Sequence, residues 1–243
     1  MLQSKFEILS NRVIAPNVYE LKLRGDTSAV AAPGQFVQIE LPGFYLRRPI
    51  SVCDAEGDVL TLIYKVVGRG TEAMSALAPG GSLDLLTGLG NGYDLSLCGD
   101  RPLLIGGGAG VPPMYLLARR LIAEGKHVRV ILGFNTASEI FYEDAFRALG
   151  ADVIVATADG SYGVKGFVTD AMDGIDCTHI CACGPEPMLR AVYNQSAAPG
   201  QFSFEERMGC GFGACMGCSC KTKYGNKRIC MDGPVLKKEE IIW

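Results

Sequence analysis

The sequence predicts an antiparallel β-barrel, then a doubly wound α/β domain with a parallel sheet, and finally a small cysteine-rich C-terminal segment. Three observations predict this order. Short alternating segments separated by Pro-Gly turns fill the N-terminal part, strand and helix patterns alternate through the middle, and half of the ten cysteines lie between positions 210 and 230. With 243 residues the chain can form two ordinary domains and an appendage. We therefore expect domains at 1–99, 100–200 and 201–243.

The N-terminal barrel is predicted from its strand patterns. Residues 19–23 and 35–41 alternate apolar and polar side chains, and residues 59–67 are largely apolar and β-branched. Pro-Gly pairs mark turns between such segments. Short strands at this spacing are typical of a closed antiparallel barrel, and one short helix is expected at 71–77.

The central part alternates strands with helices. The expected strands are short and apolar, at 102–105, 128–134, 152–156 and 179–183. The expected helices lie between or after them, at 114–124, 139–149, 166–173 and 187–194. This alternation implies a parallel sheet with helices on both faces.

Charge and composition exclude several classes of protein. The net charge of −3 argues against nucleic acid as a partner. Residues 1–7 form no apolar signal region, and no apolar run reaches the length of a membrane span. Ten cysteines without a secretory signal indicate a reducing compartment, where metal binding is more common than disulfide bonding. We therefore expect a cytoplasmic protein that does not enter a membrane.

Four cysteines carry the strongest chemical signal in the chain. Cys210, Cys215, Cys218 and Cys230 have the spacing C-x4-C-x2-C followed by a distant fourth cysteine, which is typical of plant-type [2Fe–2S] ligands. Structural zinc sites prefer repeated C-x2–4-C pairs, so zinc and disulfide pairing are weaker alternatives. Cys220 could replace Cys218, but the two-residue spacing favours Cys218. We predict a one-electron carrier in a segment held together by its cluster rather than by a large apolar core.

A glycine run precedes the first central helix. Gly106, Gly108 and Gly110 follow a buried strand, which is the order found in dinucleotide-binding turns. Backbone N–H groups and the start of a helix suit a pyrophosphate there. The third glycine position of the usual motif holds Val111, and a glycine-rich turn without a ligand is the alternative. The next strand ends at Asn135 with neither an acidic residue nor an arginine nearby, so the motif does not separate NAD from NADP.

Three shorter motifs also have the chemistry of ligand sites. Residues 47–51 combine arginine with a serine hydroxyl, which suits a phosphate and a ring edge, although a solvated turn between two strands is the alternative. Residues 68–71 predict a glycine-rich turn into a helix. Cys183 and Gly184 end a strand at the edge where parallel sheets bind ligands, and Cys183 either faces a nicotinamide or simply packs.

Taken together, these motifs resemble the ferredoxin–NADP reductase superfamily. Segments 46–53, 206–215 and 230–235 narrow the resemblance to the electron-transfer subunits of class 1B dihydroorotate dehydrogenase, over essentially the full length. The resemblance implies FAD in the barrel, NAD(H) as co-substrate and a [2Fe–2S] cluster. The implied FAD residues are Arg48, Pro49, Ile50, Ser51, Ile63, Tyr64, Lys65, Gly70 and Thr71, the dinucleotide residues are Gly106, Gly108, Gly110, Cys183 and Gly184, and the cluster ligands are Cys210, Cys215, Cys218 and Cys230.

The same resemblance implies a partner protein. Electrons would pass from NADH to FAD, to the cluster, and then to FMN in a separate catalytic subunit that converts dihydroorotate to orotate, or in the reverse direction to NAD+. The expected assembly is a heterotetramer with two copies of each subunit. A flavin exchanges both hydrides and single electrons, so the protein needs to position cofactors rather than to move protons. His127 and His179 are therefore expected to be structural, and no catalytic residue is assigned.

Two alternatives stay open at this point. A related NAD(P)H–flavin–iron–sulfur subunit of a hydrogenase, sulfide dehydrogenase or transhydrogenase would have the same modular layout. A zinc-stabilised, non-catalytic binding module belongs to a different class. A visible spectrum separates the second alternative, because flavins and iron–sulfur clusters are coloured and zinc sites are not.

Overall fold

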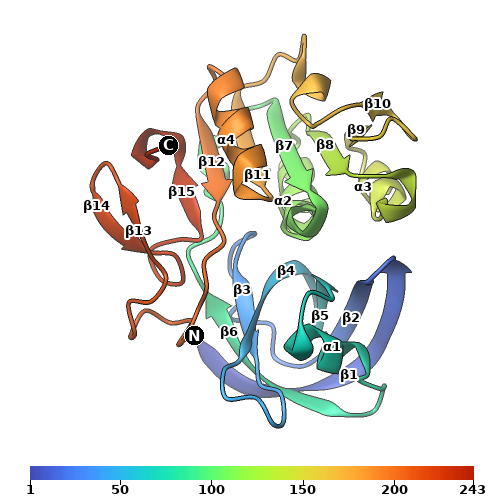
Figure 1. The fold of residues 1–243 in the computed structure, drawn as a ribbon, viewed down its shortest axis with the longest axis vertical. Helices are drawn as coiled ribbons and strands as arrows, with labels where there is room; N and C mark the ends of the chain where they lie inside the picture. The colour runs from blue at the N-terminus through green and yellow to red at the C-terminus, as the bar shows by residue number, and fades with distance from the viewer.

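A computed structural model describes residues 1–243. The N-terminal barrel and the α/β unit lie one above the other, and the C-terminal segment, drawn in red, lies beside both (Figure 1). No helix is both long enough and apolar enough to span a membrane.

The N-terminal residues form a closed antiparallel barrel, which confirms the expected architecture. Its strand order is β1-β2-β5-β4-β3-β6. The strands are β1 (Leu2–Ala15), β2 (Val18–Arg24), β3 (Phe36–Ile39), β4 (Arg48–Glu56), β5 (Val59–Lys65) and β6 (Ser82–Leu89). The short helix α1 (Arg69–Ser75) begins two residues before the expected start at 71. The three expected strand segments, at 19–23, 35–41 and 59–67, overlap β2, β3 and β5.

The motif at 47–51 lies at the start of a strand rather than in a turn between two strands. β4 begins at Arg48, with Pro49 paired to Gln38 and Ser51 paired to Phe36 across the ladder. On its other side β4 pairs with β5 only from Val52 onward. Pro49 therefore costs no hydrogen bond to β5, which is why a proline is tolerated inside this strand.

The α/β unit contains the expected parallel sheet with helices on its faces. The sheet has seven strands in the order β10-β9-β8-β7-β11-β12-β15, and all neighbours are parallel except β12 and β15. The strands are β7 (Pro102–Gly107), β8 (Arg129–Phe134), β9 (Asp152–Thr157), β10 (Val164–Lys165), β11 (His179–Cys183), β12 (Gly200–Ser203) and β15 (Val235–Lys237). The helices are α2 (Val111–Ala123), α3 (Glu143–Ala148) and α4 (Glu186–Gln195).

Two expected helices are shorter than their patterns indicate. The segment 139–149 forms a 3₁₀ turn at Ala137–Glu139 and then α3, because Tyr142 has a positive φ of 66° that interrupts a helix between them. The segment 166–173 keeps only a 3₁₀ turn at Asp170–Met172. There the Asp170 carboxylate accepts a hydrogen bond of 2.7 Å from the Phe167 N–H, so a side chain satisfies the turn.

The C-terminal segment has more regular structure than its composition suggests. β12 crosses the expected boundary at 200–201, and β15 from the C-terminal segment extends the same sheet. β13 (Ser219–Thr222) pairs with β14 (Gly225–Arg228) in a separate hairpin. Cys218 and Cys230 share a core of 19 buried residues with strands of the sheet. The expectation that only a cluster holds this segment together is therefore wrong, because apolar packing also holds it.

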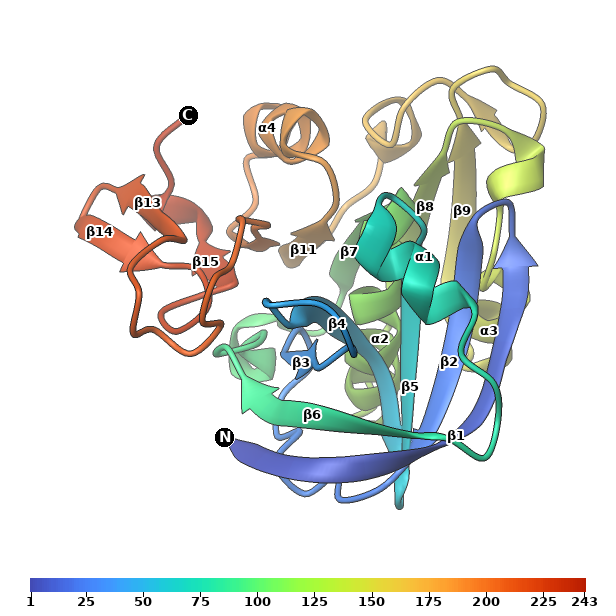
Figure 2. The ribbon, with the colours of Figure 1, turned by 60° about the horizontal axis from the view of Figure 1, so that its bottom comes forward.

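Helix α2 joins the barrel to the α/β unit. It lies against β4, directly behind the barrel strands in Figure 2. Arg119 of α2 forms an ion pair with Asp54 at 2.6 Å, and the Tyr142 hydroxyl donates to the Glu20 carboxylate at 2.8 Å. These polar contacts fix one side of the interface between the units, and a cleft opens elsewhere along it.

Candidate functional site

A large cleft lies where the three parts of the chain meet. Its volume is about 1150 Å³, enough for a dinucleotide-sized ligand. It is lined by barrel residues 46–49 and 67–71, by the start of α4, and by the C-terminal segment from Phe204 to Met208 and from Ile241 to Trp243. Five of the predicted cofactor residues line it: Arg48, Pro49, Gly70, Thr71 and Gly184.

Arg48 is a cationic side chain that lines this cleft and could bind a phosphate there. It forms no ion pair in the chain, whereas the neighbouring Arg47 is paired with Glu40 and Asp84. Its guanidinium lies 4.7 Å from the centre of the Phe44 ring, and a Cβ at Gly70 would come within 1.9 Å of its Nε. The absence of a side chain at Gly70 therefore makes room for Arg48. This contact brings together the motifs at 47–51 and 68–71, which are separate in the sequence.

Thr71 closes the turn that precedes α1. Its hydroxyl accepts hydrogen bonds from the N–H groups of Val67 at 2.9 Å and Gly68 at 3.2 Å, and donates to the Gly68 carbonyl at 3.0 Å. The Thr71 hydroxyl is thus already hydrogen-bonded to backbone groups of the turn. A phosphate at this position would instead meet the free backbone N–H groups at the start of the helix.

The other predicted FAD residues lie outside the lining of the cleft. Ile50 and Ser51 continue β4, and Ile63 is buried in a core shared with the α/β unit. Tyr64 donates to the Asn11 side chain at 3.0 Å, and burial raises the pKa of its phenol to about 12. Lys65 is exposed at the end of β5. Their contact with FAD stays a prediction from the family resemblance.

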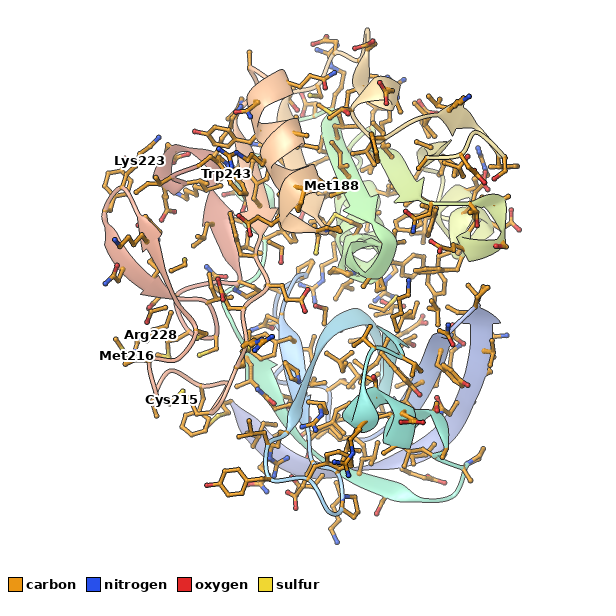
Figure 3. All side chains as sticks on the ribbon, in the orientation of Figure 1. Met188, Cys215, Met216, Lys223, Arg228 and Trp243 are labelled. Carbon is orange, nitrogen blue, oxygen red and sulfur yellow. The ribbon has the colours of Figure 1, made fainter.

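The predicted dinucleotide residues come together at the carboxyl ends of β7 and β11. Gly106 and Cys183 are partners in the parallel ladder. A Cβ at Gly110 would lie 2.1 Å from the Cys183 carbonyl oxygen, so only glycine lets the turn approach this strand end. Gly184 packs against Met188, which Figure 3 labels at the start of α4. The glycine run and the Cys183-Gly184 pair therefore form one site.

Gly108 differs from the other glycines of this run. It has a positive φ of 51°, and a Cβ built there would meet nothing within 4 Å. The positive φ favours glycine at this position. The open space beside Gly108 is where a bound pyrophosphate is expected. Cys183 is partly buried, and burial raises the pKa of its thiol to about 12, so the thiol stays protonated at neutral pH.

The four predicted cluster ligands form two pairs. Cys218 Sγ lies 3.2 Å from Cys230 Sγ, and the N–H of Cys215 donates to Cys210 Sγ at 3.4 Å. No three of these side chains surround a single point as the ligands of one ion would. A binuclear cluster takes two thiolates on each iron, so two pairs fit [2Fe–2S] better than a mononuclear zinc site.

Backbone N–H groups of the same loop point at the sulfurs. The N–H of Ala214 donates to Cys210 Sγ at 3.2 Å, and the N–H of Gly213 donates to Cys230 Sγ at 3.1 Å. Desolvation opposes ionisation of Cys210, but backbone donors from Cys215, Phe212 and Ala214 lower the pKa of its thiol to about 6. A thiolate is thus favoured at neutral pH, which is the form that binds iron.

Residues around the pairs support the loop. Arg228 donates to the Gly213 carbonyl at 2.9 Å and pairs with Asp232 at 3.0 Å, so it links the loop to the segment that carries Cys230. Figure 3 shows Cys215, Met216 and Arg228 together on the outer edge of the C-terminal segment. Cys220 lies instead on β13, lines the cleft and belongs to neither pair. No sequence pattern identified Arg228.

Replacing Arg48 with alanine is expected to lower FAD occupancy. Loss of a charge-assisted hydrogen bond to phosphate costs about 1.5–3 kcal/mol, or roughly a tenfold to hundredfold weaker affinity. FAD content after purification and the dissociation constant on readdition measure the effect. Arg24→Ala is the control, because Arg24 pairs with Glu7 and Asp58 on the barrel surface away from the cleft. Equal FAD affinity in both variants would contradict the role given to Arg48.

Two family descriptions match the chain. Residues 205–242 match the iron–sulfur cluster binding domain of dihydroorotate dehydrogenase B, and residues 104–194 match the oxidoreductase NAD-binding domain. The matched ranges contain all four paired cysteines and the glycine site at the ends of β7 and β11.

Curated relatives match the chain from end to end. The dihydroorotate dehydrogenase B (NAD(+)) electron transfer subunit of Bacillus pumilus is 44% identical, over 99% of this chain and 98% of the relative. The corresponding protein of a Geobacillus species is 42% identical, over 100% of this chain and 99% of the relative.

Solved structures agree with the fold. A structure described as the NADH-dependent reduced ferredoxin-NADP oxidoreductase, studied for flavin-based electron bifurcation, superposes with a TM-score of 0.89 at 30% identity, over 98% of this chain and 90% of that chain. A ferredoxin NADP+ reductase from Neisseria gonorrhoeae shares the fold at 17% identity and a TM-score of 0.68, covering 79% of this chain and 89% of that one. The resemblance drawn from the motifs is confirmed, and the chain belongs to the family of dihydroorotate dehydrogenase B electron transfer subunits.

Proposed function

We propose that this chain carries electrons between NAD(H), FAD and a [2Fe–2S] cluster, to or from the FMN of a dihydroorotate dehydrogenase catalytic subunit in pyrimidine biosynthesis. One observation carries the proposal. Arg48 and Gly70 of the barrel, Gly184 at the strand ends, and the C-terminal segment with the cysteines all border a single cleft of about 1150 Å³. A cofactor bound there would be within reach of both a nicotinamide and the cluster.

The proposed roles of the residues follow from the geometry. Arg48 and the backbone at the start of α1 would bind the FAD phosphates. The glycine run and Gly184 would bind NAD(H) at the ends of β7 and β11. Cys210 with Cys215, and Cys218 with Cys230, would each bind one iron of the cluster. FAD supplies the exchange between two-electron hydride transfer and one-electron transfer, and the chain positions the groups.

We further propose NAD(H) as the nucleotide, the cytoplasm as the compartment, and a heterotetramer with two copies of each subunit. The names of the curated relatives specify NAD(+), which supports the first choice. None of the ten cysteines forms a disulfide, which is consistent with a reducing compartment.

The partner subunit can be tested by reconstitution. The isolated chain is expected to reduce artificial acceptors with NADH but to form no orotate from dihydroorotate and NAD+. Adding an FMN-containing dihydroorotate dehydrogenase catalytic subunit should create NAD-linked orotate formation. Orotate is measured for each subunit alone and for the mixture, with all cofactors loaded.

The outcomes separate the proposal from its closest rival. The 30% identical solved structure belongs to a ferredoxin-NADP oxidoreductase, so a transhydrogenase-like or hydrogenase-like subunit is the specific alternative. An inactive mixture that still passes electrons from NADH to a ferredoxin would favour that alternative. Orotate formation by this chain alone would show a substrate site within it and contradict the assignment of the chemistry to the partner.

A further inference from the structure

Gln38 lies on the outer face of the barrel, in the middle of β3. Val37 and Ile39 on either side of it belong to the barrel core. Phe36, two residues before it, belongs to the core that contains Cys218 and Cys230. Because side chains alternate along a strand, Gln38 shares the face of Phe36 and points toward the C-terminal segment.

The amide of Gln38 is buried without a hydrogen-bond partner. The residue is 0% exposed, yet neither its Nε2 nor its Oε1 is bonded to any group of the chain. Gln35 is the contrast: its Oε1 accepts from the N–H groups of Ala31 and Ala32, and its Nε2 donates to the Gly90 carbonyl at 2.9 Å. An unsatisfied buried amide costs about 1–3 kcal/mol, so a partner outside the chain is the physical expectation for Gln38.

The neighbours of Gln38 indicate what that partner is. A Cβ at Gly211 would lie 2.1 Å from Gln38 Nε2, so the amide is packed against the backbone next to Cys210. Gly211 has a positive φ of 78°, and its lack of a side chain lets the loop approach the amide this closely. On the barrel side, Gln38 is the ladder partner of Pro49, which lines the cleft. Gln38 thus lies between the proposed flavin site and the cluster loop.

We propose that the Gln38 side-chain amide donates a hydrogen bond to the [2Fe–2S] cluster on the side of Cys210, and thereby raises its reduction potential. The proposal rests on the proposed function, since it requires a cluster held by the four cysteines. Backbone N–H groups already donate to Cys210 and Cys230 within the loop. Gln38 adds a donor from the FAD-binding unit, so the potential of the cluster depends on docking of the loop against the barrel.

The sign of the effect follows from charge. Reduction adds one negative charge to the cluster, and a hydrogen-bond donor stabilises the more negative state. Removing the donor should therefore lower the reduction potential. A tenfold change in the equilibrium for one electron corresponds to about 59 mV, and a shift of this order is expected for one charge-assisted bond.

The test replaces Gln38 with methionine, which has a similar length and no donor. The chain is loaded with FAD and cluster, and a redox titration is followed by electron paramagnetic resonance. The cluster potential should fall by about 59 mV, which corresponds to a tenfold change in the equilibrium constant for one electron. The FAD potential should stay unchanged. Gln38→His keeps a ring N–H at a similar reach and should restore most of the potential.

Gln35→Met is the matched control. It removes a buried glutamine from the same part of the barrel, but one whose bonds lie within the barrel, so it should lower the melting temperature without moving the cluster potential. If Gln38→Met fails to assemble, pulsed electron paramagnetic resonance on the wild-type chain labelled with ¹⁵N in glutamine side chains provides the second measurement. A ¹⁵N hyperfine coupling to the reduced cluster is the expected result.

The outcomes distinguish this inference from the proposed function. An unchanged cluster potential in fully loaded Gln38→Met, or no ¹⁵N coupling, would overturn the hydrogen bond and leave the electron-transfer role intact. A shift of the FAD potential alone would assign the amide to the flavin and also overturn the proposal. Absence of any iron–sulfur cluster in the wild-type chain would instead refute the proposed function.

Discussion

Cys215→Ser is expected to abolish assembly of the [2Fe–2S] cluster and, with it, NAD-linked orotate formation in the reconstituted complex. Cys215 lies beside Cys210, and loss of its thiolate leaves one iron of the cluster with a single cysteine ligand from the protein. A serine hydroxyl is a harder and far more weakly acidic ligand. Iron and acid-labile sulfide content after anaerobic purification should fall to background, and orotate formation should fall to the level of the catalytic subunit alone.

The matched control is Cys220→Ser. Cys220 belongs to neither cysteine pair and lies on β13, so its replacement should leave iron and sulfide content unchanged. Rapid reduction of FAD by NADH should survive in both variants, because that step precedes the cluster. A Cys215→Ser protein with normal iron content would contradict the ligand assignment, and loss of the cluster in Cys220→Ser would show that Cys220 replaces a member of a pair.

Gly108→Asp is expected to block NADH while leaving FAD in place. Gly108 faces open space with a positive φ, a conformation that aspartate tolerates better than most residues, so the fold should survive. A carboxylate about 5 Å from a phosphate charge costs about 3 kcal/mol at an effective dielectric constant near 20, or about a hundredfold in affinity. NADH should then reduce the flavin slowly, whereas dithionite should reduce it as in the wild type.

Gly125→Asp controls for backbone strain. Gly125 also has a positive φ, of 79°, with nothing within 4 Å of a built Cβ, but it follows α2 at the opposite edge of the sheet. Stopped-flow absorbance at the flavin band measures both variants. Normal NADH reduction of Gly108→Asp would contradict the placement of the pyrophosphate, and equal losses in both variants would show a general effect on folding.

Local pattern was sufficient to predict the layers, the dinucleotide turn and the iron–sulfur cluster, whereas FAD followed from the family resemblance. Alternation revealed several barrel strands, the glycine run revealed the turn into α2, and the cysteine spacing revealed the cluster. These features depend on neighbours in sequence, which periodicity and spacing describe directly. The division of the cysteines into two pairs, in contrast, depends on a fold of the loop that brings Cys230 back to Cys218.

Features that depend on distant contacts were missed. β15 has only three residues, and its partner β12 lies far away in the sequence, so neither shows a usable period. The strand at Arg48 was hidden by Pro49, which normally indicates a break. Gln38 looked like an ordinary polar residue in an alternating strand, because only the cluster loop packed over it makes the residue buried. Tertiary packing, rather than propensity, decides each of these cases.

The pairing of β12 with β15 has a consequence for how such chains can be assembled in evolution and in the laboratory. Ser203 and Val235 face each other in the ladder, so the cluster module enters and leaves the sheet at adjacent positions. The Asn91 side chain also fixes Val235, where the chain returns to the sheet. It donates to the Val235 carbonyl at 3.0 Å and accepts from the Val235 N–H at 3.2 Å. An insertion whose ends are already adjacent requires little extra loop-closure entropy. Exchange for a graft of similar span therefore adds little loop-closure cost, and the property that a graft must reproduce is the apolar packing against the sheet.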